Sequence, residues 1–268
     1  MSNNSAGGLG GGLGAWGNAT FVLTGGSTLQ GNTANKSGGG VIASGDSRLT
    51  VTASIVHGNA GRYGGGLFAE IAAMVNITDS SVRGNTVEQD GGGLTVSDKG
   101  RVVADGSLVS NNTAWGFGGG LSARDHASVS LTGGSAVSSN MANRSGGGVA
   151  ASRSAQLTIT NSSVSSNTAA GFGGGLGAWD DASVVLAGGS SVEGNTASRD
   201  GGGMFARDSA AVSITNSSVH GNAANYGGGL YEQDASQVNI TDGTVAGNTV
   251  QENGGGAKCY RRGSCCPC

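Results

Sequence analysis

The stretch SVEGNTASRDGGGM, residues 191–204, contains the pattern that runs through the whole chain. In it Asn195 is followed by a glycine triplet that ends at Gly203 and then by the apolar Met204. The phrase recurs along nearly all of the 268 residues, and successive triplets lie 26 to 28 residues apart. The triplets end at Gly12, Gly40, Gly66, Gly93, Gly120, Gly148, Gly175, Gly203, Gly229 and Gly256. A fixed period of this length predicts a solenoid of stacked coils.

The composition excludes several classes of protein. The chain has 55 glycines, but they do not fall at every third position, so it is not collagen. A net charge of −3 offers no basic stripe for nucleic acid, and no partner of that kind is expected. No apolar run approaches the ~20 residues that a membrane-spanning helix needs, and residues 1–10 lack the features of a signal peptide.

Apolar residues alternate with polar ones at fixed places in each coil, as at Val212 and Ile214. A second apolar column leads to the asparagine, at Val192 and its equivalents, and a third begins directly after the triplet. Period-two alternation with many β-branched residues predicts strands with one buried face. We therefore expect an all-β, single-stranded parallel β-helix with three short strands in each of nine to ten coils. The preference for right-handed crossovers between parallel strands favours right-handed winding.

The asparagine of the opening phrase recurs once in every coil. The column consists of Asn32, Asn59, Asn85, Asn112, Asn140, Asn167, Asn195, Asn222 and Asn248. We expect a structural role, in which each amide fills an inside corner and hydrogen-bonds to the next coil. The glycine triplets are expected to form the tight corners between strands.

Two of the recurring phrases, GGGL with VEGNTA and GGGV with VSSNTA, resemble the GGA(I/L/V) and FxxN repeats of the polymorphic outer-membrane protein family. The resemblance covers residues 2–257. In this chain a third glycine replaces the alanine of the family motif, and Val or Leu replaces its phenylalanine, as at Val82 and Val192. The resemblance implies a β-helical passenger that acts in adhesion at the cell surface or outside the cell.

An aromatic column stands immediately before the triplets, on every second coil. Its members are Tyr63, Phe117, Phe172 and Tyr226, and Trp16 and Trp179 are expected to add aromatic surface at outward positions nearby. One interpretation is ligand binding, because regularly spaced aromatic rings can stack on sugar rings. The alternative is that these rings only cover the glycine corners.

An acidic column follows the triplets. It consists of Asp98, Asp125, Asp180, Asp208 and Asp234. Aspartate is a common turn residue, which is the simpler interpretation. The alternatives are calcium bridging between stacked carboxylates and acid–base catalysis in a polysaccharide lyase or glycoside hydrolase of the pectin-lyase type.

A rank of outward threonines includes Thr24, Thr52 and Thr78, and it suggests an ice-binding solenoid as a further alternative. Its companion column is mixed, with Val22 and Asn76 among its members, and strand propensity also accounts for the threonines.

The expected function is noncatalytic adhesion, or binding of glycans and other cell-surface components, and no cofactor is expected. Residues 1–257 are interpreted as one solenoid, cut from a longer one, whose uncapped coils could associate end to end. Residues 258–268 hold all four cysteines and are expected to be an unstructured tail, with metal binding or disulfide formation as alternatives.

Overall fold

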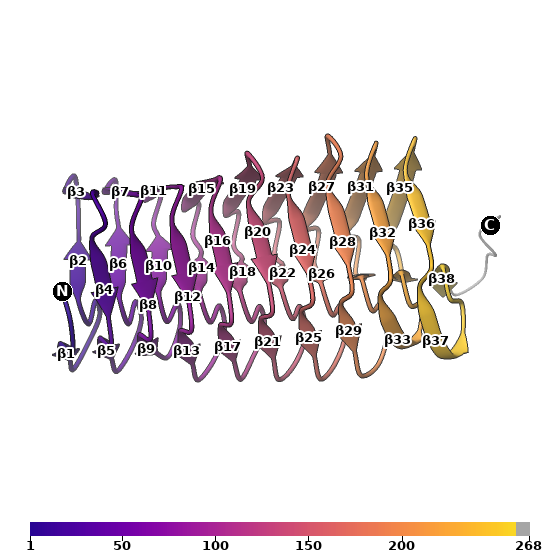
Figure 1. Ribbon diagram of the computed structural model, residues 1–268, viewed down its shortest axis with the longest axis horizontal. Helices are drawn as coiled ribbons and strands as arrows, with labels where there is room; N and C mark the ends of the chain where they lie inside the picture. The colour runs from indigo at the N-terminus through magenta and orange to yellow at the C-terminus, as the bar shows by residue number, and fades with distance from the viewer. Residues whose placement is uncertain (261–268) are drawn as a thin grey trace.

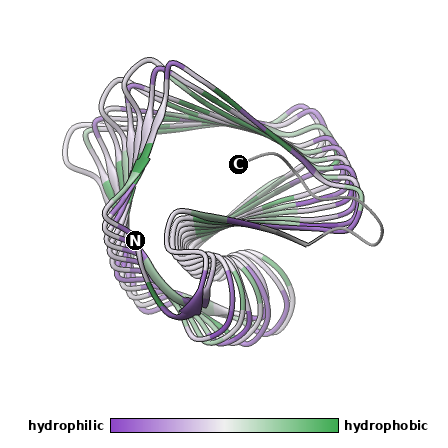
Figure 2. Ribbon diagram, turned by 90° about the vertical axis from the view of Figure 1, so that its right-hand side faces the viewer, coloured by the Kyte–Doolittle hydropathy of each residue, from purple (hydrophilic) through white to green (hydrophobic). Residues whose placement is uncertain are grey.

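The computed structural model describes residues 1–260, with side chains to residue 258, and shows a parallel β-helix. Successive coils stack along one axis from the N-terminus to the C-terminal end (Figure 1). Each coil contributes one strand to each of four parallel sheets, and the described residues contain no helix. Viewed along the axis, the coils superimpose on a common outline (Figure 2). The all-β fold class predicted from the repeat is confirmed.

We number the sheets in the order in which the chain enters them after a glycine triplet. The first sheet contains β2 (Leu13–Ala15), β6 (Val41–Ser44), β10 (Leu67–Glu70), β14 (Leu94–Val96), β18 (Leu121–Ala123), β22 (Val149–Ala151), β26 (Leu176–Ala178), β30 (Met204–Ala206), β34 (Leu230–Gln233) and β38 (Ala257–Tyr260). The second sheet contains β3 (Thr20–Leu23), β7 (Arg48–Thr52), β11 (Met74–Thr78), β15 (Arg101–Asp105), β19 (Ser128–Thr132), β23 (Gln156–Thr160), β27 (Ser183–Ala187), β31 (Ala211–Thr215) and β35 (Gln237–Thr241).

The other two sheets complete each coil. The third sheet contains β4 (Thr28–Gln30), β8 (Ile55–His57), β12 (Ser81–Arg83), β16 (Leu108–Ser110), β20 (Ala136–Ser138), β24 (Ser163–Ser165), β28 (Ser191–Glu193), β32 (Ser218–His220) and β36 (Thr244–Ala246). The fourth sheet contains β1 (Ser5–Ala6), β5 (Thr33–Ala34), β9 (Ala60–Gly61), β13 (Thr86–Val87), β17 (Thr113–Ala114), β21 (Met141–Ala142), β25 (Thr168–Ala169), β29 (Thr196–Ala197), β33 (Ala223–Tyr226) and β37 (Thr249–Asn253).

The core is built from columns of equivalent residues. Val129 of β19 pairs with Val102 of the preceding coil and with Leu157 of the next, so their side chains stack in register. Coils ~4.8 Å apart bring such side chains into van der Waals contact. One apolar cluster therefore runs from Leu13 to Leu230. A single coil has too few apolar side chains to bury, but a stack of coils gives each column a continuous interior.

The expectation of three strands per coil is corrected to four. The fourth sheet lies between the asparagine and the triplet, and most of its strands have two residues, such as Thr113 and Ala114. Ala114 is buried, while Thr113 is partly exposed. A strand with one small inward residue produces no detectable alternation in the sequence, which is why pattern analysis missed this sheet.

Each of the three glycines in a triplet is required for a different structural reason. Gly118 has a φ of 65°, a left-handed backbone conformation that side chains disfavour. A side chain on Gly119 would collide with the carbonyl oxygens of Met141 and Gly147 in the next coil. A Cβ on Gly120 would lie 2.9 Å from Nδ2 of Asn140. The triplet therefore forms a corner where backbone packs directly on backbone.

The asparagine column forms a ladder at the corner between the third and fourth sheets. Nδ2 of Asn140 donates to Oδ1 of Asn167 at 2.9 Å and to the carbonyl oxygen of Val109 at 3.0 Å. Its Oδ1 accepts from the backbone N–H and from Nδ2 of Asn112, each at 3.0 Å. From Asn32 to Asn222 these side chains are at most 1% exposed. Each interior amide thus satisfies its hydrogen-bonding groups with neighbouring coils.

A second ladder, which pattern analysis missed, lies at the corner between the second and third sheets. Oγ of Ser107 accepts from the backbone N–H of Ser80 at 3.1 Å and donates within 3.2 Å to the carbonyl oxygens of Ile77 and Asp105. Ser135 repeats the arrangement, accepting from the backbone N–H of Ser107 at 3.0 Å. Hydroxyl groups therefore bridge coils at this corner, as the amides do at the other.

Strand pairing continues past residue 257, because β38 pairs with β34 as far as Tyr260. The remaining residues of the predicted tail, including Cys265, Cys266 and Cys268, lie outside the described residues. Within the described residues no helix is long and apolar enough to cross a membrane.

Candidate ligand-binding groove

Two adjoining hollows lie where the outward face of the first sheet meets the loops that precede the triplets. The first has a volume of about 280 Å³ and the second of about 360 Å³. Phe117, Trp179 and Arg207 line both of them. Because these shared residues come from different coils, the hollows run along the solenoid, and we call them together the lateral groove.

Three aromatic rings, those of Phe117, Phe172 and Trp179, line the lateral groove and belong to a larger aromatic cluster. We call this cluster the aromatic spine: Phe117, Phe172, Trp179, Phe205, Tyr226 and Tyr231. Ring centroids lie 5.7 Å apart for Phe117 and Trp179, and 4.8 Å apart for Phe172 and Phe205. Phe205 and Tyr231 are stacked at 5.7 Å. The rings before the triplets therefore pack onto outward side chains of the first sheet, and they remain partly exposed at their outer edge.

Trp179 differs from the expectation of an outward, exposed ring, since it is only 8% exposed. The ring bends back over Gly177 of β26, the strand that it follows, where a Cβ would collide with it, and Phe117 and Phe205 pack on it. Trp16 bends over Gly14 in the same way but is 53% exposed. The glycine two positions before each tryptophan is the sequence signal for this arrangement.

Sequence reasoning missed Phe205 and Tyr231, which supply the inner rings of the spine. They occupy the outward position of the first sheet, one residue after the start of their coils. Tyr63, by contrast, belongs to the aromatic column but not to the spine. Its ring lies 4.8 Å from the guanidinium carbon of Arg124 and 5.8 Å from that of Arg62.

Cationic side chains lie over the rings of the column, and this too was not predicted. Arg144 lies 5.5 Å from the ring of Phe117, and Arg199 lies 5.5 Å from the ring of Phe172. Such cation–π contacts hold a guanidinium group in place while its N–H groups stay available to a ligand.

The arginines of the groove differ in their ion pairing. Arg124 lies 3.4 Å from Asp90, and Arg207 lies 2.7 Å from Asp208. Within residues 1–260, Arg144 forms no ion pair at 4.0 Å or less. The same holds for Arg199. Neither guanidinium group is therefore held in an ion pair, although Asp200 lies close enough to Arg199 for the two charges to attract each other.

The acidic column occupies the turn between the first and second sheets. Its members have φ values from 48° to 60°: Asp98, Asp125, Asp180, Asp208 and Asp234. Aspartate tolerates this left-handed conformation better than most residues. Arg153 interrupts the column and pairs with Asp125 at 3.2 Å. In the part of the chain that the structure describes, no group of three or more His, Cys, Asp and Glu side chains could hold a metal ion.

Two carboxyl groups near the first sheet have shifted pKa values. Burial raises the pKa of Glu70, and Asp98 adds to the effect, while a hydrogen bond from Ser44 opposes it. Burial also raises the pKa of Asp200, against the attraction of Lys258 and Arg199. Neither residue lines the two hollows.

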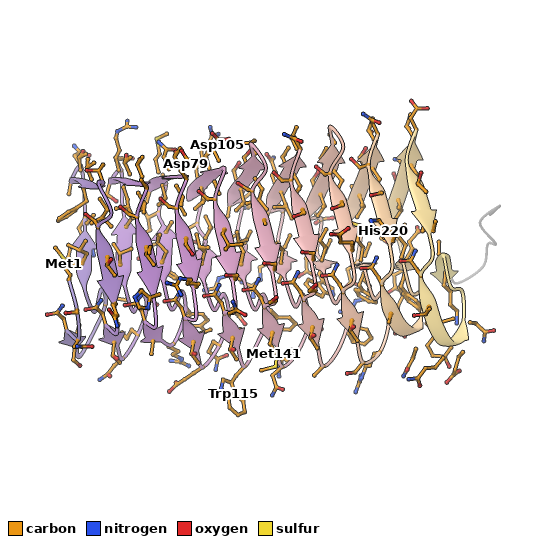
Figure 3. All side chains as sticks on the ribbon, in the orientation of Figure 1. Met1, Asp79, Asp105, Trp115, Met141 and His220 are labelled. Carbon is orange, nitrogen blue, oxygen red and sulfur yellow. The ribbon has the colours of Figure 1, made fainter. Side chains whose placement is uncertain are left out.

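A separate apolar surface lies on the fourth sheet, where Trp115 is 64% and Met141 is 50% exposed. Figure 3 shows both side chains projecting from this edge of the solenoid, opposite the edge that carries Asp79 and Asp105. Trp115 also lines a third hollow with Arg62. Trp115 has no equivalent in the other coils, so the periodicity of the sequence does not reveal it.

Comparison with protein families supports the architecture. The family model described as right handed beta helix region matches residues 102–266, more than half of the chain. The predicted right-handed winding agrees with that description. Comparisons with curated proteins and with solved structures returned no match.

Proposed function

Since this chain belongs to the right-handed β-helix family, we propose that it is a noncatalytic solenoid that binds glycans at the cell surface or outside the cell. The resemblance of its repeats to the polymorphic outer-membrane protein family supports adhesion as the role. The stacked coils also support it, because they present a long, rigid lateral surface to an extended ligand.

The observation that carries this proposal is the lateral groove. Aromatic rings and guanidinium groups alternate along it, and both hollows open onto the same wall. Aromatic side chains supply flat apolar surface for the faces of sugar rings, and arginine supplies N–H donors for their hydroxyl and acidic groups. A groove with both kinds of group suits an extended carbohydrate better than a small apolar molecule.

A polysaccharide lyase or hydrolase is the alternative, and one observation favours it. A general acid must be protonated near its working pH, and the pKa of Glu70 is raised by burial. Asp90, the half-buried carboxylate that lines the first hollow, already accepts from the backbone N–H of Phe117 at 2.9 Å and pairs with Arg124. Both carboxylate oxygens of Asp90 are thus already bound within the protein.

Two assays on one panel of polysaccharides distinguish binding from catalysis. Affinity electrophoresis measures retention of the folded protein, and a reducing-end assay measures chain cleavage. We expect retention by at least one polysaccharide without release of new reducing ends. Turnover that Glu70→Gln or Asp98→Asn abolishes would replace the binding function by the enzymatic one.

The variant Arg207→Gln locates the binding, because Arg207 lines both hollows. Its matched control is Arg101→Gln, which removes the same charge from an exposed position on the second sheet. We expect weaker retention of the first variant and unchanged retention of the second. Equal retention of both variants and the parent would place the glycan site elsewhere.

A further inference from the structure

The second hollow of the lateral groove differs from the first in its charge. Arg144, Arg199 and Arg207 line it, and no acidic side chain does. The first hollow has as many arginines, but Asp90 and Asp180 stand among them. The second hollow therefore favours an anionic group, whereas charges of both signs line the first.

Two of these arginines are placed to receive such a group. Arg144 and Arg199 are exposed, and each is supported by a phenylalanine ring of the preceding coil at 5.5 Å. Within the described chain neither guanidinium group has a carboxylate at ion-pair distance. The acidic neighbour in sequence, Asp200, is half-buried at the triplet corner. A guanidinium group positioned on a ring can bind a carboxylate or a sulfate with two parallel hydrogen bonds.

The spacing of the two arginines follows the coil repeat. They stand at the same coil position, one residue before Ser145 and Asp200, and two coils apart. Two coils of ~4.8 Å each place them roughly 10 Å apart along the axis. In the coil between them the position is Gly171, where a side chain would collide with the carbonyl oxygen of Arg144. The two cations are thus separated by one coil in which the equivalent position carries no charge.

We propose that Arg144 and Arg199 bind a linear polysaccharide that carries one acidic group on every second sugar. Successive acidic groups of an extended disaccharide repeat lie at a distance similar to that between the two arginines. The intervening sugar lies over Gly171 and against Phe172, where it needs no charge. This inference rests on the proposed function and narrows it to one class of polysaccharide.

Four probes separate the relevant chemistries in a binding titration at fixed ionic strength. Hyaluronan carries a carboxylate on every second sugar, keratan sulfate carries sulfate and no carboxylate, polygalacturonate carries a carboxylate on every sugar, and hydroxyethyl cellulose is neutral. We expect hyaluronan or keratan sulfate to bind about tenfold or more tightly than the neutral polymer, because charged hydrogen bonds are stronger than neutral ones. Which of the two binds more tightly tells whether the acidic group is carboxylate or sulfate.

The double variant Arg144→Gln with Arg199→Gln should lower affinity for the preferred acidic probe to that for the neutral polymer. It should also remove most of the salt dependence of binding. The matched control is Arg83→Gln with Arg101→Gln, which removes two exposed cations from the third and second sheets. Circular dichroism and urea unfolding confirm that both variants fold like the parent.

The outcomes separate this inference from the function on which it rests. Equal affinity for acidic and neutral polymers, tightest binding of polygalacturonate, or an unaffected double variant would overturn the inference while glycan binding stands. Absence of binding to every polysaccharide would overturn the proposed function as well.

Discussion

Replacing Asn140 by alanine tests the structural argument at one residue. The change leaves two buried donors of Asn112 without their acceptor, the backbone N–H and one hydrogen of Nδ2, both of which donate to Oδ1 of Asn140 at 3.0 Å. It also removes the donor to the carbonyl oxygen of Val109. At about 1–3 kcal/mol for each unsatisfied buried group, the two donors alone predict a loss of about 2–6 kcal/mol.

Asn4→Ala is the matched control, because Asn4 is exposed and donates to Asn32 while none of the described polar groups donates to its side chain. Its loss should stay within about 0.5 kcal/mol. Asn248→Ala should fall between the two, since Asn248 is partly exposed and its truncation would let water reach the donors of Asn222. Equilibrium urea unfolding measures all three variants. Equal, small shifts for Asn140→Ala and Asn4→Ala would refute the account of the ladder.

Three further predictions concern the corners and the first sheet. Gly119→Ala should lower the free energy of unfolding by at least about 3 kcal/mol, because the added Cβ collides with the backbone of the next coil. Gly7→Ala, the control, should be nearly neutral, since its Cβ meets nothing within 4 Å. Equal urea midpoints for the two variants would contradict this prediction. Gly177→Ala should displace the ring of Trp179 and shift tryptophan emission to the red in a Trp16→Phe, Trp115→Phe background, and unchanged emission would mean that the ring does not depend on Gly177. Because the pKa of Glu70 is raised above its ordinary value of 4.5, the folded chain binds this proton more tightly than the unfolded chain. The stability that this group contributes is therefore present below pH 4.5 and is lost as the pH rises through the raised pKa. Glu70→Gln should therefore flatten the dependence of unfolding free energy on pH above 4.5, and an unchanged profile would argue against a buried carboxyl group.

Much of the fold could be predicted because each coil of a solenoid repeats the same pattern of inward and outward residues. Val102, Val129 and Leu157 show the same inward position in the sequence that they occupy in the core. The fourth sheet could not be found in this way, since strands such as Thr113–Ala114 are too short to show a period. The serine ladder escaped notice because serine is also common in turns.

The candidate site could be predicted only in part, because it depends on departures from the repeat. The aromatic column before the triplets was visible in the sequence. The inner rings, Phe205 and Tyr231, and the cations Arg144 and Arg199 stand in only some coils, and their contacts bridge different coil positions. Periodicity in the sequence reveals what all coils share, which is the scaffold, and not the residues that distinguish one coil from another.

The central claim, that the lateral groove binds glycan, is tested most directly by hydroxyl-radical footprinting with a polysaccharide that the protein retains. Radicals oxidise aromatic and sulfur-containing side chains that solvent can reach. The account predicts that bound polysaccharide lowers oxidation of Phe117 and Phe172, while Trp115 and Met141 on the fourth sheet stay as reactive as in the free protein. Protection of Trp115 and Met141 with unchanged oxidation of the two phenylalanines would contradict it.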